Sequence, residues 1–499
     1  MEIATICAYQ VFCTWRYGIA YIGFFGMFLM YAMRLNLSLG IVCMVKRSTN
    51  RESSNLTLTN QTTPSYLNLN VTPTDGIVED QCLASIRSDS DIEGTFEWPR
   101  SLQGTMLSAY FYGYIVTQIP GGWLAKRFGA KMILFLGLTV SAAGTFLTPL
   151  AARTSMYFVI AIRVVVGIGS GVMFPCCHQL WAHWAPVFER TKLVSLSYSG
   201  TIFGNIVTYF LSGYLCVYGF DGGWPSIFYI SGIAEVVWLA IWLGLVYNSP
   251  SEHPCISEDE KDYIIDNIGD SVAKTSQRVP WLKFATSMPL IAIIVAHVCN
   301  NYVQYTLMTC LPTYMKDVLK FDMKQNGLFS SLPYVTMLIC AIIFGQLADC
   351  LRDRGIRTVI VRKVYQFLAF VLPAIFLIAA SFVDCERRMV AVGLLITAVA
   401  CSSLNRSGYV VNHLDIAPRY GGILFGITNT FATIPGMTAP IAVGQLTSNG
   451  TREEWQVVFY ICAGVAIFGA IFYSIFADGK EQSWARDQRS EQEISMMEK

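Results

Sequence analysis

Twelve long, mainly apolar stretches restrict the fold of this 499-residue chain more than any other feature. A helix needs about 20 apolar residues to cross a bilayer, and only 14% of the residues are charged, against roughly 25% in a soluble domain. We expect helices at 17–45, 101–125, 131–152, 155–182, 191–219, 224–247, 289–315, 325–348, 361–383, 389–413, 421–447 and 454–477. The predicted fold class is all-α, a polytopic membrane protein with twelve transmembrane helices in two six-helix halves. A soluble enzyme, a disordered protein and a single-span receptor are excluded.

Two long gaps between these stretches define the domain organisation. We expect a cytosolic N-terminus at 1–16, a first half at 17–247 containing the loop 46–100, a cytosolic linker at 248–288, a second half at 289–480 and a cytosolic tail at 481–499. Glycines repeat weakly between the halves, with Gly122 and Gly204 matched by Gly345 and Gly426, which indicates a six-plus-six duplication. Residues 257–261 of the linker predict a capped amphipathic helix.

Charged loops and glycosylation sequons agree on the orientation. Basic residues such as Arg127 and Arg352 gather in the even-numbered short loops, and loops of this kind face the cytosol. Both termini are then cytosolic, in a lysosomal, vesicular or plasma membrane. Loops assigned to the opposite side contain the sequons that begin at Asn55, Asn60, Asn70 and Asn449.

The 15 cysteines lie mostly inside apolar stretches. We interpret them as small buried hydrophobic residues rather than a disulfide framework. The loop residues Cys82 and Cys385 could pair with each other.

Three arginines lie deep inside predicted helices, namely Arg34, Arg163 and Arg406. A charge at the centre of a span costs about 2.5–3.5 kcal/mol on insertion scales, and Glu235 is the one obvious deep carboxylate. A guanidinium presents a planar fork that matches carboxylate or phosphate, so the excess of arginines indicates a site for a small anionic solute. Alternatively, each arginine bonds to helix-end carbonyls or snorkels outward.

Neighbouring polar residues extend this candidate site. Tyr114, Asn301 and Tyr305 could bind a polar solute, although packing is the commoner role of such residues. Alternate residues lie about 200° apart on a helix, so Tyr112 cannot share a face with Tyr114. The net charge of +1 gives no reason to expect a nucleic-acid partner. The sequence shows no nucleophile elbow, metal cluster or phosphate-binding loop, so we expect neither an enzyme nor a bound metal or cofactor.

Several motifs are shared with one transporter family. They are the stretches 112–122 (YGYIVTQIPGG), 184–186 (WAP) with Glu189 and Arg190, 328–333 (LFSSLP), 412–418 (NHLDIAP) and 426–436 (GITNTFATIPG). Over roughly residues 17–485 the chain resembles the anion-transporter branch of the major facilitator superfamily, which contains sialin, the vesicular glutamate transporters and the sodium/phosphate cotransporters. The last stretch and LFSSLP look most like sialin.

The resemblance implies a fold, a transport mechanism and roles for individual residues. The fold is the major facilitator fold, which works by alternating access on a lipid-embedded chain. Arg34 and Arg163 match the family's first-helix and fourth-helix arginines, and His178 matches its fourth-helix histidine. Gating and coupling roles are implied for the motif residues Asp349, Glu189 and Arg190.

One departure from the family pattern concerns coupling. Sialin and the vesicular glutamate transporters have a glutamate where this chain has Ser170, about 10 Å along the helix from Arg163. A hydroxyl does not titrate at cellular pH, which puts proton coupling by that route in doubt and leaves His178 and Glu235 as proton carriers. We expect H+ or Na+ as the coupling ion, and we favour sodium or the membrane potential as the driving force.

The predicted function is secondary active transport of organic anions, such as sialic acid, other acidic sugars or acidic amino acids, by a monomer. One alternative is a sodium-dependent inorganic phosphate cotransporter, which Ser170 favours and the sialin-like second half opposes. A non-transport alternative is a substrate sensor that keeps the fold without turnover. Substrate-dependent flux, as opposed to binding alone, distinguishes a transporter from a sensor.

Overall fold

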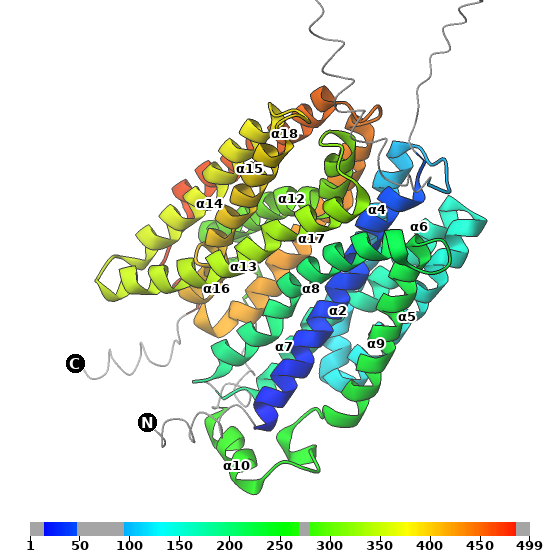
Figure 1. The fold of residues 1–499 in the computed structure, drawn as a ribbon. Coiled ribbons are helices and arrows are strands. Elements are labelled where there is room, and N and C mark those ends of the chain that lie inside the picture. Colours follow the sequence, from blue (N-terminus) through cyan, green and yellow to red (C-terminus); the bar gives the residue numbers. More distant parts are fainter. Residues whose placement is uncertain (1–13, 47–93, 187, 269–279, 486–499) are drawn as a thin grey trace, which may run out of the picture.

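The computed structural model describes residues 14–46, 94–186, 188–268 and 280–485. The α-helices are α2 (Trp15–Met44), α4 (Arg100–Phe128), α5 (Ala130–Thr154), α6 (Met156–Ser170), α7 (Met173–Trp184), α8 (Arg190–Tyr218), α9 (Trp224–Leu245), α10 (Glu258–Asn267), α11 (Trp281–Thr286), α12 (Met288–Asp317), α13 (Met323–Asp353), α14 (Thr358–Ser381), α15 (Arg388–Ser402), α16 (Tyr409–Ile416), α17 (Gly421–Leu446) and α18 (Arg452–Phe476). Three short 3₁₀ helices are η1 (Pro250–Glu252), η2 (Ser403–Arg406) and η3 (Pro418–Tyr420). Figure 1 shows the long helices as one bundle with α10 at one end.

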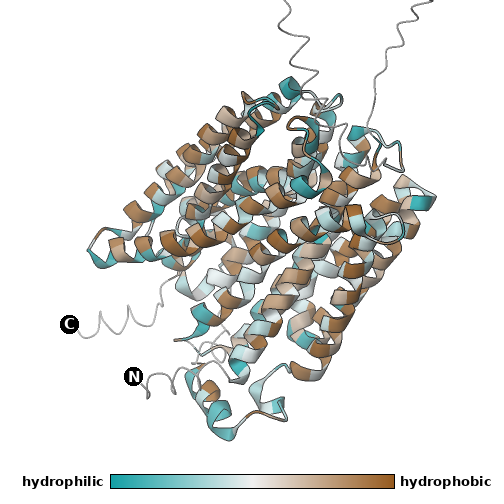
Figure 2. Ribbon diagram, in the orientation of Figure 1, coloured by the Kyte–Doolittle hydropathy of each residue, from teal (hydrophilic) through white to brown (hydrophobic). Residues whose placement is uncertain are grey.

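Apolar side chains cover much of the outside of the bundle. Figure 2 shows hydrophobic residues along the helix shafts and hydrophilic residues towards the helix ends. Ile119, Leu150 and Ile475 are 71%, 63% and 62% exposed, which water would disfavour and a bilayer accommodates. Ten of the described helical segments are long and apolar enough to cross a membrane. The less apolar helices α4 and α17, with 29 and 26 residues, pack against each other and complete the twelve predicted passages.

Two of the predicted helices are broken. The fourth passage consists of α6 and α7, separated by Gly171 and Val172. The tenth consists of α15, η2 and α16 and continues to Ile416. Its break falls in a run rich in serine and asparagine, where the hydroxyls of Ser402 and Ser403 donate to carbonyl groups three residues earlier. Such local bonds compete with a regular helix.

We call α2 to α9 the first half and α12 to α18 the second half. The end of the bundle where α10 lies is the linker side, and the opposite end is the disulfide side, because a disulfide there joins Cys43 of α2 to Cys216 of α8. This bond corrects the expectation that the cysteines are only buried hydrophobic residues. Both cysteines sit near helix ends inside apolar stretches, so the sequence alone did not show that α2 and α8 pack side by side. Cys385 is also disulfide-bonded, and Cys82 lies outside the described residues.

The halves approach most closely on the disulfide side. A Cβ atom on Gly213 of α8 would lie 2.8 Å from Cα of Gly327 in α13, and one on Gly104 of α4 would collide with the Pro440 carbonyl of α17. On the linker side, by contrast, Gly345, Gly422 and Gly426 have no atom within 4 Å of an added Cβ. Glycine therefore permits backbone contact between the halves at one end and leaves open space at the other.

Polar bonds also cross between the halves. Arg100 of α4 pairs with Asp317 of α12 at 2.6 Å, and Ser38 of α2 donates to the Thr309 carbonyl at 2.6 Å. Further along α4, the Gln118 amide donates to Thr433 of α17 at 2.9 Å. These contacts join the two halves from the disulfide side, at Arg100 and Asp317, towards the middle of the bundle, at Gln118 and Thr433.

Candidate functional site

Arg34 of α2 lies at the interface between the halves and is only 4% exposed. Aromatic rings surround its guanidinium carbon, with centroids at 4.6 Å (Tyr31), 4.7 Å (Tyr114), 5.0 Å (Tyr110), 5.4 Å (Phe111) and 6.0 Å (Tyr305). Tyr305 belongs to α12, so both halves contribute to this shell. Nε and Nη2 of Arg34 have no hydrogen-bond partner among the described residues.

The electrostatics of Arg34 favour an anion as its partner. Each cation–π contact is worth about 0.5–2 kcal/mol, but a ring face offers no acceptor in the guanidinium plane. A buried cation without a counterion costs several kcal/mol in effective desolvation. Two parallel N–H groups without acceptors match the fork geometry of a carboxylate or phosphate.

Arg163 of α6 is buried as well, but both of its terminal nitrogens are already bonded, and only Nε has no partner among the described residues. Nη1 donates to the Met33 carbonyl and to the side-chain oxygen of Asn36, each at 3.0 Å. Nη2 donates to the Arg34 carbonyl at 2.9 Å. Arg163 therefore fixes the backbone of α2 beneath Arg34, which is the role of a positioning residue.

The other predicted site residues separate into two groups. Tyr114 and Tyr305 lie beside Arg34, whereas Tyr112 points away and is 44% exposed, as the helix geometry predicts. Asn301 is buried and donates to the Ala432 carbonyl of α17 at 2.9 Å, which ties α12 to α17 rather than reaching Arg34.

Arg406 ends η2 in the interrupted tenth passage. It interacts electrostatically with Tyr31, which also packs on Arg34, and with Tyr409. Its buried Nε has no partner among the described residues. The adjacent Asn405 donates to Asn300 at 2.7 Å, and Asn300 lines a mostly apolar pocket inside the second half.

The residues predicted for coupling lie in different surroundings. Ser170 is fully buried, donates to the Val166 carbonyl at 2.9 Å and lies 3.0 Å from the Ser141 hydroxyl of α5. Glu235 in α9 is also fully buried, and neither of its carboxylate oxygens has a partner in the described part of the chain. His178 in α7 packs edge-on against Tyr198 at 5.6 Å.

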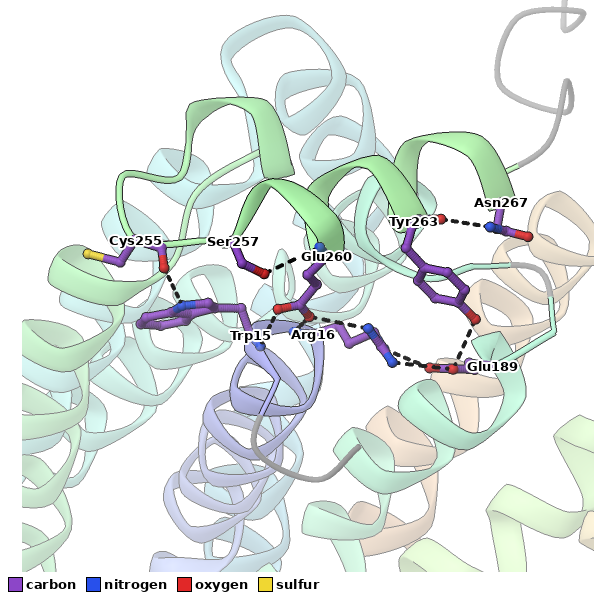
Figure 3. A network of polar contacts seen from close by, with 8 residues as sticks. All are labelled: Trp15, Arg16, Glu189, Cys255, Ser257, Glu260, Tyr263 and Asn267. Carbon is purple, nitrogen blue, oxygen red and sulfur yellow. Dashed lines mark hydrogen bonds and ion pairs between the residues drawn. The ribbon is translucent and has the colours of Figure 1, made fainter. Parts of the chain in front are cut away.

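Glu189 belongs to a network that anchors the linker helix (Figure 3). It pairs with Arg16 at 2.8 Å and accepts from the Tyr263 hydroxyl at 3.2 Å, while Glu260 of α10 accepts from the backbone N–H groups of Trp15 and Arg16. Ser257 caps α10 by accepting from the Glu260 N–H at 3.3 Å, which confirms the predicted capped helix. The network attaches α10 to the first half.

Arg190 and Asp349 complete the predicted gating residues. Arg190 donates to the Ala185 carbonyl at 3.4 Å, and Asp349 is exposed near the linker-side end of α13. Neither residue approaches Arg34 in any contact of the described chain.

One of the four glycosylation residues falls in the described chain. Asn449 is exposed, and its amide donates to Glu454 at 2.8 Å. Asn55, Asn60 and Asn70 lie outside the described residues. No metal-binding group of three or more ligands occurs in the part of the chain that the structure describes.

Sequence reasoning missed several residues that surround the site. Tyr31 lies one helical turn before Arg34, a spacing that could have indicated a shared face. His297 and Tyr409 pack with their rings 4.9 Å apart, but a lone histidine in an apolar helix carries no pattern that predicts this.

A bundle of apolar helices, with a cation buried between two halves and two of its nitrogens without partners among the described residues, is the arrangement expected of a membrane solute transporter. Comparison with known proteins agrees, because a model of the Major Facilitator Superfamily matches residues 23–440. The chain belongs to this superfamily, and the predicted all-α fold is confirmed. It is a multi-pass membrane transporter and not an enzyme.

Individual relatives and one solved structure support this assignment. Sialin from Homo sapiens is 41% identical over 486 residues, which cover 97% of this chain and 92% of that protein. A putative inorganic phosphate cotransporter from Drosophila melanogaster is 38% identical over 487 residues, which cover 96% of this chain and 88% of that protein. The crystal structure of a bacterial homolog to the human lysosomal transporter Spinster, in an inward-facing and occupied conformation, matches with a TM-score of 0.65 at 12% identity and covers 92% of this chain and 96% of that one. The resemblance to the sialin-containing branch is thereby confirmed.

Proposed function

We propose that the protein carries a small organic anion across a membrane by alternating access, as a secondary active transporter. The observation that carries this proposal is Arg34, a buried guanidinium at the interface of the halves, two of whose nitrogens have no partner in the described part of the chain. An anion bound there neutralises the cation, and movement of the halves about the site exposes it to each side in turn.

The substrate class that we propose is an acidic sugar such as sialic acid, or an acidic amino acid. Sequence similarity to sialin along 97% of the chain supports the sugar. Inorganic phosphate is the second candidate, because Ser170 replaces a carboxylate that would repel a multivalent anion and because a relative is named as a phosphate cotransporter. Tyr110 and Tyr114 would contact the solute from the first half, and Tyr305 from the second.

We propose that the linker side is cytosolic and that the membrane is lysosomal, vesicular or plasma membrane. Basic loop residues support this orientation. So does the Cys43–Cys216 disulfide, because disulfides persist on the non-cytosolic face. Glycans at Asn55, Asn60, Asn70 and Asn449 would lie on that same face. The proposed unit is a monomer, and the coupling ion is H+ or Na+.

Counterflow in proteoliposomes tests the proposal. Purified full-length protein is loaded with unlabelled sialic acid, glucuronate, aspartate or phosphate, and uptake of the labelled counterpart is measured. We expect exchange of at least one of these anions, and a loss of at least tenfold in Arg34→Gln because its neutral amide leaves the anion unpaired. Arg153→Gln is the matched control, since Arg153 is 48% exposed and pairs with Asp221 away from the site. Normal exchange by Arg34→Gln would contradict the proposal.

A further inference from the structure

The Arg406 side chain extends from the second half towards the first. Its chain neighbours Asn405 and Ser407 are buried, whereas Arg406 itself is partly exposed. It interacts electrostatically with Tyr31 of α2, so its guanidinium faces the first half. The side chain makes no hydrogen bond within the described chain, and its Nε is buried. Arg406 therefore borders open space at the interface of the halves.

The break in the tenth passage sets the position of Arg406. Inside a membrane, the backbone groups that a broken helix frees need partners within the protein, and transporters often build binding sites at such breaks. Here α14 supplies the partners. Nη1 of Arg362 donates to the Ser407 carbonyl at 2.9 Å, and the side-chain oxygen of Gln366 accepts from the Tyr409 N–H at 3.0 Å. Arg362 and Gln366 hold the backbone that follows Arg406, so they are positioning residues for it.

Tyrosines connect Arg406 to Arg34. The Tyr31 ring packs on the Arg34 guanidinium at 4.6 Å and also interacts with Arg406. Tyr409 interacts with Arg406 and with Tyr305, whose ring centroid lies 6.0 Å from the Arg34 guanidinium carbon. The two arginines thus border one tyrosine-lined space from opposite halves.

This space carries an excess of positive charge. In the described part of the chain no carboxylate pairs with Arg34 or Arg406, and Asp415 at the end of the tenth passage is paired with Arg362 at 2.6 Å. A buried cation without a counterion is unfavourable, and one acidic group neutralises one guanidinium. Two acidic groups are therefore needed to neutralise both arginines. An ammonium group on the solute would add a positive charge that no carboxylate of the site offsets.

We propose that Arg406 binds a second acidic group of the solute, and that the carrier prefers dicarboxylates without an amino group. This inference rests on the proposed function and narrows its substrate class. One carboxylate pairs with Arg34 and the other with Arg406, because a guanidinium matches a carboxylate with two parallel hydrogen bonds. Since the arginines belong to opposite halves, a dicarboxylate bridges the halves. A monocarboxylate such as sialic acid leaves Arg406 without a counterion.

Competition for exchange in proteoliposomes tests the proposal. The labelled probe is whichever of sialic acid, glucuronate, aspartate and phosphate exchanges fastest in counterflow with the full-length protein. The competitors are succinate and glutarate, each with two matched analogues. Succinamate and glutaramate replace one carboxylate by a neutral amide, and aspartate and glutamate add an ammonium group. For the better of the two dicarboxylates, we expect half-maximal inhibition at a concentration at least about tenfold below that of either analogue, a typical effect of one charge-assisted hydrogen bond.

Variants of the second half assign this preference to Arg406. Arg406→Gln should reduce the preference for the dicarboxylate over its monoamide to less than about threefold, while the monoamide inhibits as it does in wild type because Arg34 still binds one carboxylate. A general defect in folding would change both values. Gln366→Met removes the acceptor for the Tyr409 N–H and should lower the same ratio, which keeps the test available if Arg406→Gln does not fold.

Arg388→Gln is the matched control. Arg388 begins the same passage at its other end and packs on Phe321 at 5.0 Å, away from Tyr31. This variant should retain the wild-type preference.

Several results would overturn the proposal. Equal inhibition by the dicarboxylates and their monoamides in wild type would exclude a second acidic group and leave anion transport at Arg34 intact. An unchanged preference in Arg406→Gln would show that this group binds elsewhere. Inhibition by phosphate without inhibition by either dicarboxylate would place all of the negative charge at one arginine. If wild type exchanges none of the anions, the proposed function fails and this inference fails with it.

Discussion

The ion pair between Arg100 and Asp317 should control how easily the halves part on the disulfide side. Their closest N–O distance is 2.6 Å, and the side chains are 29% and 6% exposed, respectively. Asp317→Asn keeps the shape of the side chain but removes its charge. We expect this change to weaken closure on the disulfide side and to raise the population of the state that is open there.

The magnitude follows from the burial of the pair. Exposed ion pairs contribute about 0.2–1 kcal/mol, whereas close charge pairs in a protein interface can reach about 1.5–7 kcal/mol. Arg100 remains partly solvated, so we expect about 1–2 kcal/mol, which is roughly a five- to thirtyfold change in the equilibrium between the two states. Apparent affinity scales with the population of the binding-competent state. The apparent Kd for anion added from the disulfide side should therefore fall by up to that factor while the open state remains the minor one.

A double-mutant cycle measures this coupling. Arg100→Gln, Asp317→Asn and the double variant are compared by the concentration of anion at half-maximal exchange from each side of oriented proteoliposomes. Arg153 and Asp221 provide the matched control, because they form an ion pair of the same length, 2.6 Å, within the first half. If Asp317→Asn changes sidedness no more than Asp221→Asn does, the pair does not hold the halves together and the reasoning is refuted.

Two other predictions follow from single side chains. Arg163→Lys retains the charge but removes the guanidinium, whose Nη1 donates to Met33 and Asn36. Losing one charged hydrogen bond, worth about 1.5–3 kcal/mol, should raise KM for the anion roughly tenfold or more. An unchanged KM would exclude a positioning role for Arg163. Burial, with a contribution from Lys131, lowers the pKa of His253 in the linker. Neutral His253 therefore stabilises the folded state above pH ~6.5, and this contribution is lost on acidification at no more than about 1.4 kcal/mol per pH unit. Thermal unfolding between pH 7.5 and 5.5 should show a smaller drop in Tm for His253→Gln than for wild type, and equal drops would contradict this assignment.

Hydropathy predicted the passages well because a bilayer imposes one length and one polarity on every spanning helix. The break at η2 escaped prediction, since its serines and asparagine are individually compatible with a helix in an apolar surrounding. Arg34 and Arg163 were predicted together from the cost of burying charge. That cost is the same for both, so only the coordinates show the difference between them. Both terminal nitrogens of Arg163 are bonded to α2, whereas Nε and Nη2 of Arg34 have no partner among the described residues.

The hydrogen bond between His297 and Thr428 shows what a single sequence cannot reveal. His297 and Thr428 are 131 residues apart in the chain, and their hydrogen bond depends on how α12 packs against α17. His413 stands in the stretch NHLDIAP, and its Nε2 lies 2.9 Å from the hydroxyl of the same Thr428. This partner comes from another helix, which neither periodicity nor composition encodes.

The glycines where the halves touch also make the two ends of the carrier differ in how they tolerate amino-acid substitutions. At Gly104, Gly213 and Gly327 every possible replacement adds volume and none removes it, so missense variants there can only wedge the disulfide side apart. Gly345, Gly422 and Gly426 face open space in this conformation, so a bulkier residue there would clash only when the halves close on the linker side. Variants at the two ends should consequently trap the protein in opposite orientations, even though each changes a residue of the same type.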